Sequence, residues 1–327
     1  MRPFEFTRAP SLKEAGSLTA ASDSMAIAGG TNLLDLMKLQ VETPSRLADL
    51  NRLGFAQIED TDDGGLLLGA LATNTETAVH PRVRRDYPVL ARAILAGATQ
   101  QLRNKATNGG NLCQRTRCFY FTNIDQPCNK REPGSGCGAI DGIAKLHAIL
   151  GTSDQCIATY PGDMAVALSA LDATVLVSGP GTDRSVPLRE FHVLPGDTPW
   201  VENVLERGEI ITGITLPPPV GGTQLYRKVR ERSSYAFALV SIAAIVEIAD
   251  GKFTRADLAF GGLAHKPWHD PHLADALVGQ APSRELFDTA ADILLEDARG
   301  YGENDFKIPL ARRTLHAVLQ QAAEDAA

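Results

Sequence analysis

The sequence has no run of 18 or more apolar residues, and its N-terminus lacks a basic segment followed by an apolar stretch. The first absence predicts that no helix spans a membrane, and the second that this chain carries no secretion signal of its own. An excess of positive charge is also lacking, because the formal net charge is -7. We therefore expect no nucleic-acid partner. The length of 327 residues suits two or three globular domains.

Cysteine is scarce, with only five residues in the chain. An odd number of thiols fits a disulfide framework poorly in a chain without a secretion signal. Four of the five are grouped in one part of the sequence. Metal or cluster ligation is therefore the better interpretation of these four. They are Cys118, Cys128, Cys137 and Cys156.

Two common nucleotide-binding motifs are missing, the Rossmann fingerprint G-x-G-x-x-G and the Walker loop that ends in Gly-Lys-Ser/Thr. The sequence has instead two diglycine loops, at residues 28–33 and 107–112. Glycine permits positive φ and has no Cβ, so the backbone N–H groups around it can converge on an anion. A single diglycine is more often a plain tight turn, but two in one domain favour a phosphate or nucleotide cradle.

Apolar periodicity outlines the secondary structure, and glycine and proline mark its breaks. A strand at 25–28 is expected to lead into a helix at 31–39 that Thr31 or Asn32 caps. The proline run at 217–219, with the Val-Gly-Gly that follows it, predicts a linker. Further strands are expected at 65–70, 173–177, 209–216, 226–229, 238–248 and 258–262, and helices at 87–95, 163–171, 283–298 and 308–323.

The two diglycine loops, together with Gln101-Leu102-Arg103-Asn104, resemble the FAD-binding medium subunit of the xanthine dehydrogenase and molybdenum aldehyde oxidoreductase family. The resemblance covers nearly the whole chain and implies an α+β fold. It implies a two-lobed FAD-binding domain of the vanillyl-alcohol-oxidase type over 1–216, with lobes at about 1–55 and 56–216. A small α+β C-terminal domain of the CO dehydrogenase flavoprotein type would follow over 222–327.

The resemblance also implies which residues bind FAD. In the family the first loop lies on the FAD pyrophosphate, the second approaches the pyrophosphate and the flavin, and an aspartate in a Pro-x-Asp segment contacts the adenosine ribose. A lysine on a strand that passes the ring would donate to a flavin carbonyl, where its charge favours the reduced anionic flavin. The implied residues are Ile27, Ala28, Gly29, Gly30, Thr31, Asn32, Leu33, Leu34, Thr107, Gly110, Asn111, Asp163 and Lys228.

Two of these residues also have ordinary structural interpretations. Asp163 precedes a predicted helix, and its side chain would serve equally well as the N-cap of that helix. Lys228 is about as well explained as a solvated surface lysine. Isolated histidines such as His147 show no metal-ligand spacing and are more often structural residues.

The cysteine-bearing insertion at about 113–157 is similar to that of the flavin subunit of PaoABC-type periplasmic bacterial aldehyde oxidoreductases, in which it holds a [4Fe-4S] cluster. A related insertion occurs in the flavin subunit of 4-hydroxybenzoyl-CoA reductase. Four thiolates satisfy the irons of a cubane cluster, and the intervals between them are unlike those of zinc knuckles. A zinc site with unusual loops is the alternative.

The surroundings of the four ligands leave two questions open. Cys113 is assigned to packing beside the flavin, yet it would be able to replace Cys118 as a ligand. Four basic residues flank the ligand positions and would either offset the charge of the cluster or face a partner or solvent. They are Arg115, Arg117, Lys130 and Arg131.

The resemblance predicts an electron-transfer subunit with FAD and a [4Fe-4S] cluster. In a heterotrimer, a large subunit with a molybdenum cofactor would hydroxylate an aldehyde, and a small subunit with two [2Fe-2S] clusters would pass the electrons to this flavin for an external acceptor. The alternatives are the flavin subunit of a related molybdenum hydroxylase, a stand-alone flavin oxidase and a zinc-stabilised binding module. The expected location is the periplasm, by co-export with a signal-bearing partner, and the cytoplasm is the alternative.

Overall fold

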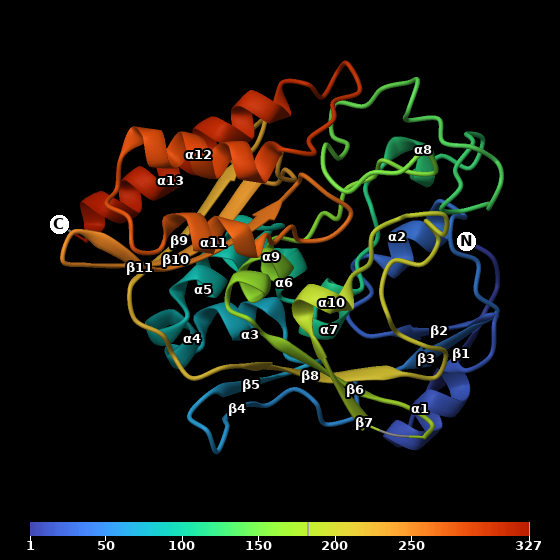
Figure 1. The fold of residues 1–327 in the computed structure, drawn as a ribbon. Helices are drawn as coiled ribbons and strands as arrows, with labels where there is room; N and C mark the ends of the chain where they lie inside the picture. Colours follow the sequence, from blue (N-terminus) through green and yellow to red (C-terminus); the bar gives the residue numbers. More distant parts are fainter. Residues whose placement is uncertain (182, 327) are drawn as a thin grey trace.

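The computed structural model describes residues 1–181 and 183–326. Its N-terminal lobe contains a three-stranded parallel sheet in the order β1-β3-β2, drawn in blue in Figure 1. The predicted strand at 25–28 is confirmed, and the helix after it begins two residues later than expected. The bounds are β1 Glu5–Arg8, α1 Leu12–Thr19, β2 Ser24–Ile27, α2 Leu33–Lys38 and β3 Arg46–Asp49.

The second lobe is built on a five-stranded antiparallel sheet in the order β4-β5-β8-β6-β7. Its helices, apart from α8 in the insertion, lie between this sheet and the C-terminal part of the chain (Figure 1). The strands are β4 Ile58–Asp60, β5 Leu66–Gly69, β6 Thr174–Ser178, β7 Asp183–Pro187 and β8 Ile210–Leu216. The helices are α3 Asn74–Val79, α4 Pro81–Asp86, α5 Pro88–Ala96, α6 Gln100–Arg103, α7 Asn108–Leu112, α8 Phe119–Thr122, α9 Asp163–Ala170 and α10 Leu188–Phe191.

The C-terminal part forms an antiparallel sheet in the order β11-β10-β9. Helices α12 and α13 cover one face of this sheet, and α5 and α9 lie against the other (Figure 1). Sequence analysis missed the short helix α11. The bounds are β9 Thr223–Val229, β10 Val240–Ala249, β11 Lys252–Gly261, α11 Pro271–Leu277, α12 Arg284–Leu295 and α13 Lys307–Asp325.

Strand β10 is buried on both faces because successive side chains of a strand point in opposite directions. Ile242, Ala244 and Val246 belong to the core under α12 and α13. Ala243 and Ile245 belong to the core that β5, α5 and α9 share. One strand therefore joins the C-terminal sheet to the second lobe through continuous apolar packing.

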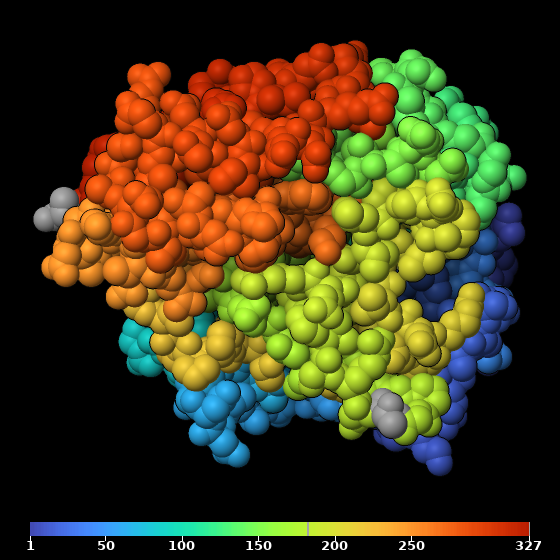
Figure 2. Space-filling view, in the orientation of Figure 1, coloured from blue at the N-terminus to red at the C-terminus, as the bar shows by residue number. Residues whose placement is uncertain are grey.

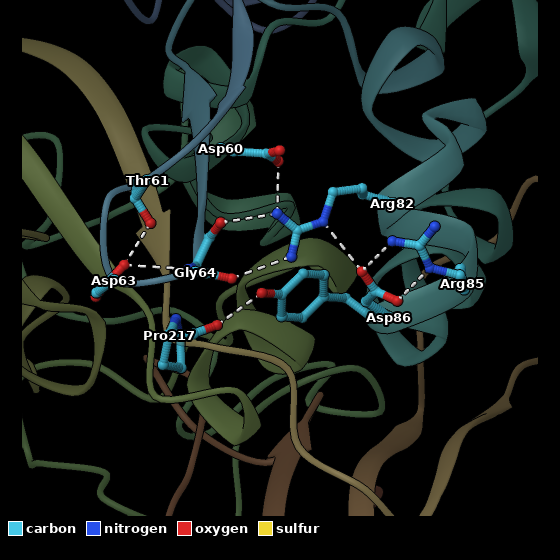
Figure 3. A network of polar contacts seen from close by, with 10 residues as sticks. Asp60, Thr61, Asp63, Gly64, Arg82, Arg85, Asp86 and Pro217 are labelled. Atoms are coloured by element: carbon cyan, nitrogen blue, oxygen red, sulfur yellow. Dashed lines mark hydrogen bonds and ion pairs between the residues drawn. The ribbon is translucent and has the colours of Figure 1, made fainter.

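Helix α4 and Tyr87, the residue after it, tie the hairpin of β4 and β5 to the start of the linker (Figure 3). Arg82 pairs with Asp86 at 3.0 Å and with Asp60, and it donates to the carbonyl oxygens of the β4–β5 turn. The Tyr87 hydroxyl donates to the Pro217 carbonyl at 2.6 Å. The chain therefore leaves β8 in a fixed direction before it enters β9.

The insertion at 113–157, in green in Figures 1 and 2, consists mainly of turns and lies at the surface between α2 and the loop before α13. Its second half is held to the C-terminal part. The Arg299 N–H donates to the Ile149 carbonyl, and the Tyr301 hydroxyl donates to Thr152. Among the described residues, no helix is both long enough and apolar enough to span a bilayer.

A buried amine joins α13 to this insertion. The Lys307 side chain is fully buried, and its Nζ donates to the carbonyl oxygens of His147 and Gly262, each at 2.8 Å. Burial lowers the pKa of Lys307 to about 7. In the unfolded chain a lysine titrates near about 10.4. Between these values the unfolded chain binds more protons than the folded protein, so the free energy of unfolding rises with pH.

We expect Lys307→Met to remove most of the rise of the free energy of unfolding with pH, because methionine does not titrate. The measurement is the free energy of unfolding in urea at several pH values between neutral and mildly alkaline. Lys252→Met, at an exposed position, is the matched control and should keep the slope of the wild type. An equal slope in wild type and Lys307→Met would contradict the assignment.

Candidate cofactor site

The first diglycine loop connects β2 to α2, and its shape requires glycine at two positions. A Cβ on Gly29 would lie 1.9 Å from the Lys105 carbonyl oxygen, so no side chain fits there. Gly30 has a φ of +72°, in the left-handed region that glycine adopts without strain. The backbone N–H groups of this turn are therefore left uncovered by side chains.

The second loop begins the short helix α7. Thr107 is the N-cap, and its hydroxyl oxygen accepts from the Gly110 N–H at 3.3 Å. Asn108 is fully buried beneath the helix and donates to the Gly69 carbonyl at 3.2 Å. A Cβ on Gly109 would come within 3.2 Å of the Ala70 side chain, so the loop lies close against the end of β5.

The two loops meet, as the sequence predicted. The Arg115 N–H, just after α7, donates to the Asn32 side-chain oxygen at 2.9 Å. Both loops line one cavity of about 140 Å³. A second cavity of about 500 Å³ shares Thr31, Asn32 and Gly110 with the first. Together the two cavities form one elongated cleft with the glycine loops at one end.

The predicted FAD residues are almost all found in this cleft. The smaller cavity is lined by the first loop with Thr107 and Gly110, and the larger one by Asn111, Asp163 and Lys228 as well. Leu34 is the exception, because its side chain lies behind Gly30 and lines neither cavity. That these residues contact FAD stays a prediction, but the geometry brings them together.

Asp163 and Lys228 form a buried ion pair. The Lys228 Nζ lies 2.8 Å from the Asp163 carboxylate, and the two side chains are only 4% and 9% exposed. The Tyr226 hydroxyl donates to the same carboxylate at 2.6 Å. Both ordinary interpretations are therefore wrong: Gly162 is the N-cap of α9, and Lys228 is not solvated. Sequence reasoning had no means of pairing residues so far apart.

Two buried donors in the cleft have no partner among the described residues, the Asn32 amide nitrogen and the Arg117 Nε. Buried polar groups are normally hydrogen-bonded. Both residues line the larger cavity. We therefore expect a bound ligand to supply the acceptors for these two donors. Glycine turns for phosphates, a volume of hundreds of cubic ångströms and unpartnered donors together fit a dinucleotide such as FAD.

The four grouped cysteines converge as predicted. Cys118, Cys128, Cys137 and Cys156 line one small cavity, while Cys113 lines the cavity of the glycine loops. Cys128 and Cys137 are paired across a β-bridge. A hydrogen bond from the Cys156 thiol lowers the pKa of Cys137 to about 6. The thiols therefore form one group, although 38 residues of sequence separate the first from the last.

No three cysteine, histidine or acidic side chains of the described residues are grouped so as to hold a single metal ion. Four sulfurs around one zinc ion stand only about 3.8 Å apart, as Zn–S bonds of about 2.3 Å in a tetrahedron require. In a cubane cluster each thiolate binds a different iron, so the sulfurs stand farther apart. Four cysteines around a shared cavity are the feature that the two kinds of centre have in common.

Three of the basic residues beside the ligands hold the insertion in place. The Lys130 side chain is 1% exposed, and its Nζ lies 2.9 Å from a Glu202 carboxylate oxygen. Arg115 pairs with Glu202 and also with Glu42. Arg131 donates to the carbonyl oxygens of residues 120, 121 and 126. These three charges are turned inward, so they do not face solvent.

His147 is a neighbour of the cysteines that the sequence did not indicate. Its Nε2 lies 3.1 Å from the Cys118 sulfur, while its Nδ1 is buried without a partner among the described residues. Burial lowers the pKa of His147 to about 4, so the ring is neutral at pH 7. An N–H hydrogen bond to a ligand sulfur is one of the ways in which a protein tunes a cluster.

Comparison with protein families divides the chain at the linker. A family described as the FAD binding domain in molybdopterin dehydrogenase matches residues 2–219. A second, described as the CO dehydrogenase flavoprotein C-terminal domain, matches residues 224–322. The two matches cover both parts of the fold, and the predicted fold class is confirmed.

Individual proteins resemble the chain over its full length. The aldehyde oxidoreductase FAD-binding subunit PaoB of Escherichia coli (strain K12) is 52% identical over 328 residues, 100% of both chains. The carbon monoxide dehydrogenase medium chain of Hydrogenophaga pseudoflava is 24% identical over 98% of this chain and 96% of that chain.

Solved structures share the fold. Carbon monoxide dehydrogenase from Hydrogenophaga pseudoflava, in a form that lacks the Mo-pyranopterin moiety of its cofactor, superposes with a TM-score of 0.77 at 23% identity. The match covers 99% of this chain and 98% of that chain. Quinoline 2-oxidoreductase from Pseudomonas putida 86 gives a TM-score of 0.76 at 24% identity, with the same coverage.

Proposed function

Because the chain belongs to the FAD-binding subunits of the molybdenum aldehyde oxidoreductase family, we propose that it passes electrons from a partner subunit to an external acceptor. The observation that carries the proposal is the cleft that both glycine loops line, with four cysteines gathered a short distance along the chain. Bound FAD would accept electrons one at a time and release them as a pair.

The residues of this chain hold the cofactor and exclude water from it. The turn at Gly29 and Gly30 presents N–H groups to the pyrophosphate, and the Thr107 cap fixes the second loop. The Asp163–Lys228 pair closes the far wall of the larger cavity. Because the pair is nearly buried, it gives the cleft a rigid polar wall.

The second cofactor that we propose is a [4Fe-4S] cluster held by Cys118, Cys128, Cys137 and Cys156. Support comes from the cavity that the four cysteines share. Iron-sulfur clusters pass one electron at a time, and a flavin can take up its two electrons in two such steps. We leave Cys113 out of the proposed set, because it lines the cavity of the glycine loops.

The substrate reaction would take place on another polypeptide. An aldehyde and water would give a carboxylic acid, two protons and two electrons at the molybdenum of a large subunit. The electrons would then pass through the [2Fe-2S] clusters of a small subunit to this chain. The 52% identity to an aldehyde oxidoreductase subunit supports the aldehyde as substrate class. Export to the periplasm with a signal-bearing partner stays a prediction.

The test is a visible spectrum and a metal analysis of the protein, produced together with the chains encoded beside it. We expect flavin bands and a broad iron-sulfur absorption, both bleached by dithionite, and bleaching by an aldehyde in the assembled complex. Flavin without iron would favour a stand-alone oxidase. A colourless protein that contains zinc would overturn the proposed function.

A further inference from the structure

We infer that Arg117 is the residue of this chain that sets the redox potential of the flavin, by supplying a positive charge to the ring end of the cleft. The inference rests on the proposed function only in requiring FAD in the cleft. It differs from the sequence prediction, which gave this role to Lys228.

Apart from Asp35, the other charged side chains of the larger cavity already have partners. Lys228 is neutralised by Asp163 at 2.8 Å. Glu231 pairs with Lys145, and Arg232 donates to the Tyr235 carbonyl oxygen at 2.9 Å. Arg103, also at this cavity, donates to the carbonyl oxygens of residues 95, 97 and 98. The charges of Lys228 and Glu231 are neutralised by these ion pairs. The guanidinium groups of Arg103 and Arg232 keep their charge but are turned toward backbone carbonyl oxygens.

Arg117 has no such partner. Among the described residues its guanidinium makes no ion pair and no hydrogen bond, and its Nε is buried. Asp35, exposed at the edge of the cavity, lies beyond ion-pair distance of Arg117. Leaving a cation partly desolvated and unpaired is costly, so an anionic or strongly accepting group in the cavity would be bound favourably.

The guanidinium is held in a defined orientation. Its carbon lies 5.3 Å from the centroid of the Phe237 ring, over the ring face. On the other side the backbone is fixed, because the Cys118 N–H donates to the hydroxyl of the buried Thr116 at 3.3 Å. A planar guanidinium that is stacked on a ring presents its N–H groups edgewise. Such a fork suits the carbonyl and nitrogen edge of an isoalloxazine.

The position of Arg117 favours a contact with the flavin ring of FAD over a contact with its phosphates. The phosphate-binding turn at Gly29 and Gly30 lines the smaller cavity, where the nearby arginine is Arg115. Arg117 lines only the larger cavity and the space next to it. The walls of the larger cavity include Ala93, Ile94, Leu102 and Phe237, which suit an aromatic ring. We place the isoalloxazine there because Lys228, which the resemblance assigns to a flavin carbonyl, lines the same cavity. Asp163, which is paired with Lys228, would then stand beside the ring and not at the adenosine ribose.

A positive charge beside the flavin affects its oxidised and reduced states unequally. Reduction adds electrons to the ring, and a cation nearby stabilises the reduced form more than the oxidised form. Removing the charge should therefore weaken binding of reduced FAD more than binding of oxidised FAD. A tenfold loss of this preference corresponds to a potential lower by about 30 mV for a two-electron couple.

The test compares Arg117→Gln, Arg117→Lys and Arg313→Gln in the assembled complex, with the flavin potential read by spectroscopic titration. Arg313 is exposed and has neither a hydrogen bond nor an ion pair among the described residues, so its variant controls for net charge. We expect the preference for reduced over oxidised FAD to be at least tenfold smaller in Arg117→Gln than in the wild type. Arg117→Lys should keep part of it, and Arg313→Gln all of it.

Two results would overturn the inference. One is an unchanged potential in Arg117→Gln with full flavin content. The other is a loss of FAD from Arg117→Gln and Arg117→Lys alike, with an unchanged potential in the flavin that remains, which would make Arg117 a phosphate-binding residue. A wild-type protein without flavin would instead refute the proposed function itself.

Discussion

Replacing Cys128 with alanine is expected to abolish iron binding while FAD is retained. The cysteine is 7% exposed and shares its cavity with the three other proposed ligands. A cubane cluster needs about four thiolates, one for each iron, and a buried alanine offers no replacement. Iron content should fall from about four per chain to near zero, and the broad iron-sulfur absorption should disappear beneath unchanged flavin bands.

The loss should also reduce stability, because a cluster that binds only the folded insertion adds its binding free energy to folding. Thermal unfolding would show the effect as a lower melting temperature in Cys128→Ala. Cys113→Ala is the matched control, since Cys113 lines the cavity of the glycine loops instead. Iron retained in Cys128→Ala, or lost from Cys113→Ala, would show that the ligand set is wrong.

Substituting Gly29 with alanine is expected to remove FAD from the protein almost completely. The added Cβ would lie 1.9 Å from the Lys105 carbonyl oxygen. The oxygen is part of the backbone and the Cβ is bonded directly to the backbone, so neither atom can turn aside. The two loops must then separate, which moves the N–H groups away from the phosphates that they would hold. Overpacking of this kind costs about 1–3 kcal/mol even in a core that can adjust.

The measurement is the FAD content of the purified variant, together with its melting temperature. Gly221→Ala is the control, because the Cβ added there meets only a Glu247 oxygen at 4.0 Å. That variant should retain its flavin. Full FAD occupancy in Gly29→Ala would mean that the close approach of the loops is not needed for binding.

Much of this fold was predictable because its longer elements carry a clear apolar pattern. The strands β8 and β10, and the helices α5, α9, α12 and α13, were all expected close to their observed bounds. The missed elements are short. The strand β4 has three residues, and β1 has four and pairs with β3, whose partner residues lie some forty positions farther along the chain. No local pattern can reveal such a pairing.

Some features of the candidate site were likewise predictable from the sequence, and others were not. The glycine loops and the cysteine group were recognisable because each is a local run with a physical reason for its composition. The ion pair of Asp163 and Lys228, and the contact of His147 with Cys118, join residues that are far apart in sequence. Their partners are decided by how β9, α9 and the insertion pack, which a single sequence does not encode in any local pattern.

The double-sided burial of β10 has a consequence for how the cofactor enters. Alternate side chains of β10 are buried in two different cores. The part of the cleft wall formed by β9, which pairs with β10, therefore cannot move outward unless apolar packing on both faces of the sheet is disrupted. A movement of β9 is therefore not the route by which FAD would enter. We expect FAD to exchange through the mouth of the cleft, without detachment of this strand.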